Sequence, residues 1–429
     1  MSPMTKETIA MSEEELQRLG LMELVEEGNI TLKEAGEKMG VSYRQAKRLR
    51  KKVKKWGPRG LVHGGRGRPA TNRIGPEVRQ RVLFLSAEFY GGFNDTHFTE
   101  MLKEREGIEL SRETVRKLRR GSGQAPKRSR RAPRHRKRRE RMAQEGLMML
   151  WDGSPHRWFG PEHPSCSLMV SVDDATGKIL AARFFPFEGS YGYLWLLRRV
   201  AKGYGIPLSV YQDRHGSLKR NDSNWSVEEE LDGRREPTQV GAALEALAIR
   251  PIFALSPQAK GRVERLFGTL QDRLAAELAF NGIHAIEEAN KFLEAEFIKR
   301  YNCRFALKAR QTAKAWRKPP GELERKISFK YAATVANDNT VSLGGIVIDI
   351  LRGPSGRSYA KARVEVRQLL NGAWRVYYGE KLIAKHRATE PNEPIRALTR
   401  KYQRTKSQSW VYLKSKPHDL TKGTFSLCY

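Results

Sequence analysis

The first sixty residues carry apolar side chains at helical spacing, interrupted by three helix-start signatures. In each signature a hydroxyl side chain precedes a Glu or Gln by three positions, which is the arrangement of a capping box. The three pairs are Ser12 with Glu15, Thr31 with Glu34, and Ser42 with Gln45. A short turn around Gly40 separates the second and third predicted helices. We therefore predict a helix-turn-helix domain over residues 1–58.

A second helical pattern follows a segment of glycines, prolines and arginines. Residues 59–75 are predicted to be a basic linker, because Gly and Pro disfavour regular structure. Residues 76–122 show apolar helical periodicity with a turn at residues 107–110. They resemble another helix-turn-helix domain, and packing against the next domain is the alternative role. The strongly basic residues 123–145 are predicted to be a linker that either screens phosphates or is simply solvated.

From residue 147 the pattern changes to short apolar runs separated by turns. Three runs, at 147–151, 167–172 and 178–185, predict strands, and the turn-forming residues 173–177 join the last two as a hairpin. Further along, the pattern predicts a helix at 191–204, a strand at 207–211, a helix at 239–247, a strand at 250–254 and a helix from 257 to about 278. This order predicts an RNase H-like α/β fold over residues 146–310.

Short alternating segments return after a proline-containing connector. Residues 311–390 include five such segments, at 340–343, 346–350, 361–367, 374–378 and 381–384. Asn371-Gly372 is a strong hairpin turn between the last two long segments. Several short strands in so little chain predict a small C-terminal β-barrel. Residues 391–429 form a basic tail without periodicity.

Charge and composition narrow the possible partners. The chain has 80 Lys and Arg against 48 Asp and Glu, a formal charge of +32, which favours a polyanion such as DNA or RNA. It contains no run of about eighteen apolar residues and no apolar signal region, so we expect a cytoplasmic, nucleoid-associated protein without membrane contact. Three distant cysteines (Cys166, Cys303 and Cys428) exclude a zinc finger and a disulfide framework.

Three carboxylates are the candidate chemistry of the central domain. Asp152 and Asp213 follow the first and fourth predicted strands, which are parallel neighbours in this topology. Glu264 lies off the apolar stripe of the long helix and can face the same sheet edge. Three gathered carboxylates imply hard divalent cations, so we expect two Mg²⁺ or Mn²⁺ ions. Two such ions favour nuclease or transesterase chemistry at a phosphate.

The polar neighbours of these carboxylates have simpler interpretations beside the functional ones. Asp173 and Asp174 sit where a hairpin turn is expected, and a turn role is favoured over metal binding. His156 and His215 either shuttle protons or orient local structure. Lys260 lies one helical turn before Glu264, so it would contact DNA or pair with that carboxylate.

The central segments resemble the integrase core of bacterial insertion-sequence DDE transposases, close to the ISNCY group and related to retroviral integrases. The resemblance is carried by residues 151–159 (Trp-Asp-Gly-Ser-Pro-His-Arg-Trp-Phe), 173–177 (Asp-Asp-Ala-Thr-Gly), 211–215 (Tyr-Gln-Asp-Arg-His), 256–265 (Ser-Pro-Gln-Ala-Lys-Gly-Arg-Val-Glu-Arg) and 269–274 (Thr-Leu-Gln-Asp-Arg-Leu). It extends from the first helix-turn-helix to about Phe305, and the predicted barrel is similar to the C-terminal barrels of integrases.

This resemblance implies that Asp152, Asp213 and Glu264 are the catalytic, metal-binding triad. It also implies cleavage at element ends, joining of the 3′-hydroxyls to target DNA, and a homo-oligomer that holds two terminal inverted repeats together. One departure is the separation of Asp213 and Glu264, which is longer than usual in integrases. The excess maps to polar residues 218–235, and a surface-loop insertion there costs little closure entropy.

Basic side chains in three regions are the candidate contacts to double-stranded DNA, with a solvated basic surface as the alternative. They are Arg44, Lys47, Arg48 and Lys51 in the first domain, Arg66 and Arg68 in an AT-hook-like segment, Arg112 and Arg116 in the second helical domain, and Lys260 and Arg262 near the triad. Two other functions stay open. One is a catalytically inactive DNA-binding regulator derived from a transposase, and the other is a metal-dependent, structure-selective nuclease.

Overall fold

The computed structural model describes residues 9–66, 73–127, 139–220, 227–233, 235–254, 261–390 and 394–395. The chain divides into two compact units, residues 1–84 and 85–429. Among the described residues, no helix has both the length and the apolar character needed to cross a membrane.

The first unit contains the three helices expected from the capping signatures. They are α1 (Glu13–Glu26), α2 (Leu32–Lys38) and α3 (Tyr43–Trp56), with Ser12, Thr31 and Ser42 as their N-caps. A 3-10 turn, η1 (Gly57–Leu61), follows α3 and buries Leu61 against Met22 and Leu49. The beginning of the predicted linker is therefore ordered structure that completes the small apolar core.

The second helical segment consists of α4 (Pro76–Glu88), α5 (Asp95–Arg105) and α6 (Arg112–Gly121). Asn94 and Ser111 cap α5 and α6 through side-chain oxygens that accept backbone N–H groups, which explains where these helices begin. Phe98, Leu102 and Val115 are fully buried between them. The boundary between the two units falls within α4.

The central domain is built on a five-stranded sheet with the strand order β3-β2-β1-β4-β5. The strands are β1 (Met148–His156), β2 (Cys166–Asp173), β3 (Ile179–Phe185), β4 (Ser209–Gln212) and β5 (Arg250–Phe253). The first three pair antiparallel, whereas β1, β4 and β5 are parallel. This is the strand order and direction that the sequence pattern predicts for an integrase-like α/β core.

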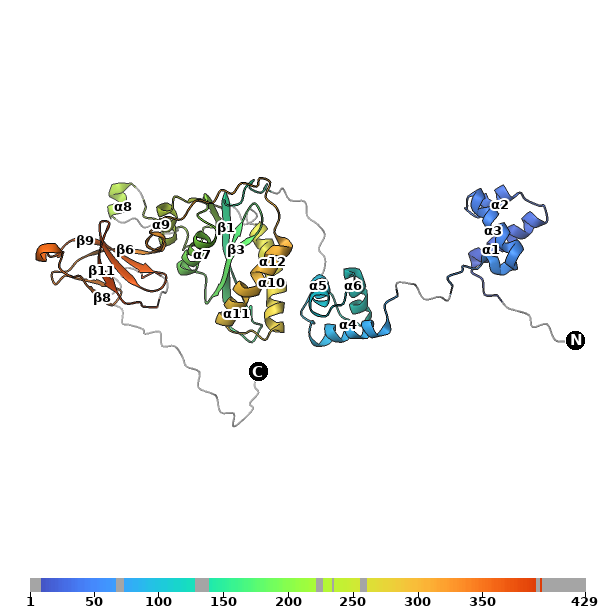
Figure 1. Ribbon diagram of the computed structural model, residues 1–429, viewed down its shortest axis with the longest axis horizontal. Coiled ribbons are helices and arrows are strands. Elements are labelled where there is room, and N and C mark those ends of the chain that lie inside the picture. Colours follow the sequence, from blue (N-terminus) through green and yellow to red (C-terminus); the bar gives the residue numbers. More distant parts are fainter. Residues whose placement is uncertain are drawn as a thin grey trace, which may run out of the picture. The chain divides into compact units, whose positions relative to one another are not determined.

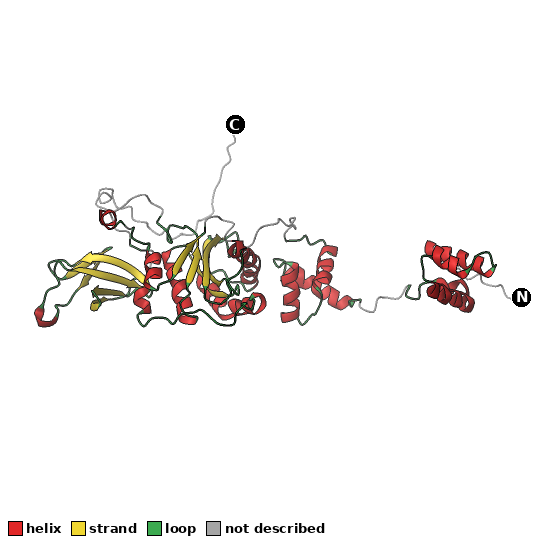
Figure 2. Ribbon diagram, turned by 90° about the horizontal axis from the view of Figure 1, so that it is seen from above, coloured by secondary structure: helices red, strands yellow, loops and turns green. Residues whose placement is uncertain are grey.

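Helices cover both faces of this sheet (Figures 1 and 2). On one face α7 (Ser190–Gly203) and α9 (Gln239–Ala246) pack against Met149 and Trp151. On the other, α10 (Gly261–Phe280), α11 (Ile286–Phe292) and α12 (Ile298–Phe305) pack against Met148 and Leu150. A π-helical turn (Leu293–Phe297) joins α11 to α12. The two apolar clusters divide the residues of β1 by strict alternation.

The extra residues between β4 and α9 are not only a loop. Part of them forms the short helix α8 (Val227–Asp232), and Glu229 is buried where it accepts hydrogen bonds from the Glu236 backbone N–H and from Arg220. Leu218 is also buried, in the apolar cluster of α7 and α9. The insertion is therefore tied to the core at its described ends.

The C-terminal region differs from the predicted closed barrel. After α13 (Leu323–Lys326), the strands β6 (Ser328–Thr334), β9 (Arg363–Leu369), β10 (Trp374–Tyr378) and β11 (Lys381–His386) form an open sheet in the order β11-β10-β9-β6. Separately, β7 (Thr340–Leu343) and β8 (Ile346–Asp349) form a hairpin. Among the described residues β6 and β11 remain sheet edges, because the hairpin packs Val341 and Ile348 into the core as a second layer.

Candidate functional site

Asp152 lies on β1, and Asp213 directly follows β4, the parallel neighbour of β1. The register pairs Met148 with Ser209 and Leu150 with Tyr211, and the same offset places Asp152 opposite Asp213. Paired neighbouring strands are about 4.8 Å apart, so this offset directs the two aspartates to the same edge of the sheet. The parallel ladder stops at Leu150, although β1 continues to His156, so both aspartates lie just past the paired stretch.

Glu264 lies on the helix that covers this part of the sheet. By alternation along β1, Asp152 and Ser154 face the same side as Leu150, which is the side of α10. The Nε2 atom of Gln271 donates to Oγ of Ser154 at 3.2 Å, and Gln271 lies two helical turns after Glu264 on one helix face. The Glu264 face of α10 therefore lies against the aspartate face of the sheet.

The described contacts of the three carboxylates are local ones. The carboxylate of Asp152 accepts the N–H of Gly153 at 3.1 Å, and that of Asp213 accepts the N–H of His215 at 2.9 Å. Glu264 is an exposed side chain in the first turn of α10. Within the described ranges, no three carboxylate, histidine or cysteine side chains are already grouped as a metal site.

Buried aromatic groups support the aspartates from the α7 side of the sheet. The indole Nε1 of Trp151 donates to Oε1 of Gln212 at 3.0 Å, which joins the residues that directly precede the two aspartates. The ring of Tyr193 lies 5.2 Å from that of Trp151. Burial, followed by the charges of Glu188, Asp152 and Asp213, raises the pKa of Tyr193 well above its ordinary value. The Tyr193 hydroxyl therefore interacts electrostatically with both aspartates and stays protonated.

Glu188 is a neighbour of the site that the sequence analysis missed. It precedes α7, accepts a hydrogen bond from the Tyr193 hydroxyl, and lies against the backbone of Gly153. A single Glu in a loop after a strand has no motif, and only the folded sheet brings it next to Asp152.

Asp173 and Asp174 have the turn role that the sequence favours. The carboxylate of Asp173 accepts N–H groups from Gly146 and Thr176 at 2.9 Å, and burial raises its pKa despite these bonds. The carboxylate of Asp174 is fully buried and pairs with Arg139 and Arg262. Asp173 thus holds the hairpin turn, and Asp174 links this turn to the start of α10 through Arg262.

The two histidines near the aspartates take part in local structure. The Nδ1 atom of His215 accepts the N–H of Ser217 at 3.3 Å, and the His156 ring packs edge-on against Trp158. Cys166 is buried and Cys303 is exposed, both as free thiols, whereas Cys428 lies outside the described residues.

Comparison with known proteins gives one family match and two similar curated relatives. Residues 17–70 match the family described as a helix-turn-helix domain. The "Transposase for insertion sequence IS1202" of Streptococcus pneumoniae is 33% identical over 347 residues, which cover 73% of this chain and 72% of that protein. The chain belongs to the insertion-sequence transposase family. The "Putative transposase y4bF" of Sinorhizobium fredii (strain NBRC 101917 / NGR234) is 38% identical over 299 residues, 70% of this chain.

The matched part of the chain spans 64% of the length of the Sinorhizobium relative. Among solved structures, an intasome of simian T-cell lymphotropic virus with a PP2A regulatory subunit is similar over 72% of this chain and 99% of that chain, with a TM-score of 0.30 and 15% identity. The HTLV-2 integrase catalytic core with magnesium is similar over 34% of this chain and 83% of that chain, with a TM-score of 0.24 and 16% identity.

The first domain of the transposase presents the basic residues expected on a reading helix. Arg44, Lys47, Arg48 and Lys51 are all exposed on α3. The Lys47 ammonium lies 4.5 Å from the centre of the Tyr43 ring, which leaves both side chains on the outer surface. This arrangement fits contacts to bases and phosphates in a major groove.

Arg66 has a different setting from the one its AT-hook-like segment predicts. Its guanidinium pairs with the buried Glu15 carboxylate of α1 at 2.6 Å and donates to the carbonyl of Ala10 at 2.7 Å. The amides of Ser12 and His63 and the Arg66 guanidinium lower the pKa of Glu15 to about 2. Arg66 thus links the end of the first domain to the start of α1. Arg68 lies outside the described residues.

The basic face predicted on α6 is partly internal. Arg112 and Arg116 are exposed, and Arg116 pairs with Glu113 at 2.6 Å. Arg119 is buried and pairs with Asp95 at 3.0 Å. Arg119 therefore holds α5 and α6 together, and only the outer arginines of this helix face solvent.

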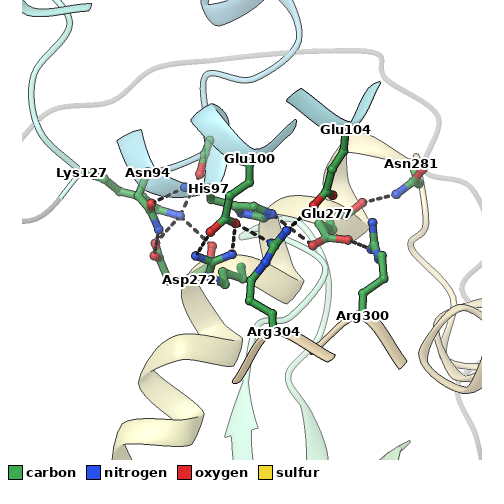
Figure 3. A network of polar contacts seen from close by, with 12 residues as sticks. Asn94, His97, Glu100, Glu104, Lys127, Asp272, Glu277, Asn281, Arg300 and Arg304 are labelled. Atoms are coloured by element: carbon green, nitrogen blue, oxygen red, sulfur yellow. Dashed lines mark hydrogen bonds and ion pairs between the residues drawn. The ribbon is translucent and has the colours of Figure 1, made fainter. Parts of the chain in front are cut away.

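A polar network joins α5 to the core helices α10 and α12 (Figure 3). The Nε2 atom of His97 lies 3.1 Å from Oε1 of Glu277, and Arg304 pairs with Glu100 at 2.6 Å. Burial raises the pKa of Glu277, but the His97 bond and the Arg300 charge outweigh it and lower the pKa below its ordinary value. The described residues of the second helical domain therefore pack against the core, which is the alternative role that the sequence left open.

Of the two DNA contacts predicted near the triad, the structure describes Arg262 but not Lys260. Arg262 is occupied by the buried Asp174 carboxylate and by the carbonyl of Arg139. Lys260 lies outside the described residues. Arg262 therefore ties the first turn of α10, where Glu264 lies, to the hairpin of Asp174.

Proposed function

We propose that this chain is a DDE transposase that binds the ends of its insertion sequence, cleaves DNA there and joins the 3′-hydroxyl ends to target DNA. One observation carries the proposal. The parallel pairing of β1 with β4, on a sheet face covered by α10, supports a centre formed by Asp152, Asp213 and Glu264. Relatives named as transposases, one of them matched over 72% of its length, support the same reaction class.

The three side chains fit hard divalent cations. All of their donors are carboxylate oxygens, which suit Mg²⁺ or Mn²⁺ better than Zn²⁺. Two bound ions would supply charge stabilisation at the phosphate and make a water or 3′-hydroxyl more acidic. Asp152 and Asp213 would hold the ions from adjacent strands, and Glu264 is exposed in the first turn of α10 and so free to turn toward them.

The remaining parts of the chain would bring DNA to this centre. We infer that Arg44, Lys47, Arg48 and Lys51 of α3 bind the terminal inverted repeats, and that Arg112 and Arg116 add contacts to the backbone. Two element ends must be held together for concerted joining, so the active form is a homo-oligomer on DNA. The formal charge of +32 supports a large electrostatic share of the affinity.

The test is a cleavage and strand-transfer assay with Mg²⁺ on labelled duplexes that cover the DNA on either side of the gene. We expect Asp152→Asn to abolish both the cleavage and the strand-transfer product, because the negative charge on β1 that would hold a divalent ion is lost. DNA binding should be kept. Asp349→Asn, an exposed aspartate on β8, is the matched control. Full activity of Asp152→Asn would refute the triad. Hydrolysis products alone would favour a nuclease, and DNA binding without any metal-dependent cleavage would favour a regulator.

A further inference from the structure

A fourth carboxylate lies directly behind the first aspartate. A Cβ atom built on Gly153 would clash with the Oε2 and Cδ atoms of Glu188, so this carboxylate lies on the Gly153 backbone. Gly153 follows Asp152, and consecutive Cα atoms are about 3.8 Å apart, which places the Glu188 carboxylate within roughly 8 Å of the Asp152 Cα atom.

Tyr193 fixes the position of that carboxylate. Its hydroxyl donates to Oε1 of Glu188, and the tyrosine is fully buried in α7 with its ring against Trp151. A buried aromatic ring has little freedom, so the hydroxyl is a rigid donor. Glu188 is therefore held between α7 and β1 by one hydrogen bond and one close backbone contact.

Glu188 and the aspartates approach the strand from opposite sides. Alternation along β1 turns Asp152 toward α10 and residue 153 toward α7. A side chain at 153 would fill the space that Glu188 occupies, which explains why glycine suits this position although its backbone is not in the left-handed region.

We propose that Glu188 is a positioning residue of the ion centre: it braces β1 at Gly153 and its charge, held in place by Tyr193, raises the affinity of the Asp152–Asp213 pair for divalent cations. This inference rests on the proposed function. An ion on the Asp152 carboxylate lies on the far side of β1, so its distance from the Glu188 charge is roughly 12 Å; a unit charge at that distance from a divalent ion, screened as in water, changes the ion's affinity about threefold.

The test is Mn²⁺ binding to the full chain without DNA, followed by the electron paramagnetic resonance signal of the free ion. We expect Glu188→Gln to weaken binding about threefold through the lost charge. Tyr193→Phe and Gly153→Ala should weaken it less, because the charge remains but is displaced. The control is Glu162→Gln, an exposed glutamate of the same domain. Circular dichroism confirms that each variant is folded.

The double variant Tyr193→Phe/Glu188→Gln separates positioning from general stability. If Tyr193 acts through Glu188, its substitution has no further effect on Mn²⁺ affinity once the charge is gone. Unchanged affinity in Glu188→Gln, with weakened binding in Asp152→Asn, would overturn this inference alone. Unchanged affinity in both would overturn the ion centre itself.

Discussion

The polar network between α5 and the core is expected to set how readily the second helical domain opens. In Glu277→Ala, the fully buried His97 loses the acceptor of its Nε2 atom, and its Nδ1 atom has no partner either. A buried polar group left unsatisfied costs about 1–3 kcal/mol, and Arg300 loses its partner at the same time. We therefore expect a loss of about 2 kcal/mol, which is roughly a 30-fold change in an opening equilibrium.

Native-state hydrogen exchange measures this opening in α5 (Asp95–Arg105). The α5 amides should exchange about 30-fold faster in Glu277→Ala, whereas β1 and β2 amides keep their protection. Glu113→Gln is the matched control, since Glu113 forms an exposed pair within α6 and such pairs contribute little. Equal exchange of α5 in wild type and Glu277→Ala would refute the view that these ion pairs hold the domain on the core.

Three further outcomes follow from particular contacts. The pKa of Glu15 falls from 4.5 to about 2 on folding, so the stabilisation by this carboxylate is complete above pH 4.5 and is lost as the pH falls toward 2. The melting temperature of the first domain should therefore fall over this pH range, and in Glu15→Gln it should not. Trp151→Phe removes the buried donor to Gln212 and should lower the melting temperature of the central domain by about 2–4 °C, measured by circular dichroism; an unchanged transition would contradict that role. Lys47→Ala should reduce the salt slope of DNA binding by about 0.9, while the exposed Lys33→Ala on α2 keeps it.

Local signals in the sequence were sufficient for most elements. The hydroxyl caps at Ser12, Thr31 and Ser42 act within one helical turn, so they could be found without knowing the fold. The alternating runs also predicted the order of the central strands. In the C-terminal region β6 was missed, because its Ala332-Ala333 end lacks the alternation of its neighbours and it is a strand chiefly through pairing with β9.

Partners distant in the sequence could not be predicted in the same way. The parallel topology was enough to bring Asp152 beside Asp213, because the register follows from two short strands. The pairing of Arg66 with Glu15 and the placement of Glu188 on Gly153 depend on tertiary packing that no local pattern records. Which basic residues face solvent and which form internal ion pairs therefore depends on how the helices pack, and the sequence alone does not show it.

The most direct measurement of the proposed centre is anomalous diffraction from crystals of the full chain soaked in Mn²⁺. The account predicts Mn²⁺ about 2.1 Å from carboxylate oxygens of Asp152 and Asp213, with Glu264 turned inward to join them. Ions found only elsewhere, with Asp152 and Asp213 bound to protein groups alone at saturating Mn²⁺, would contradict it.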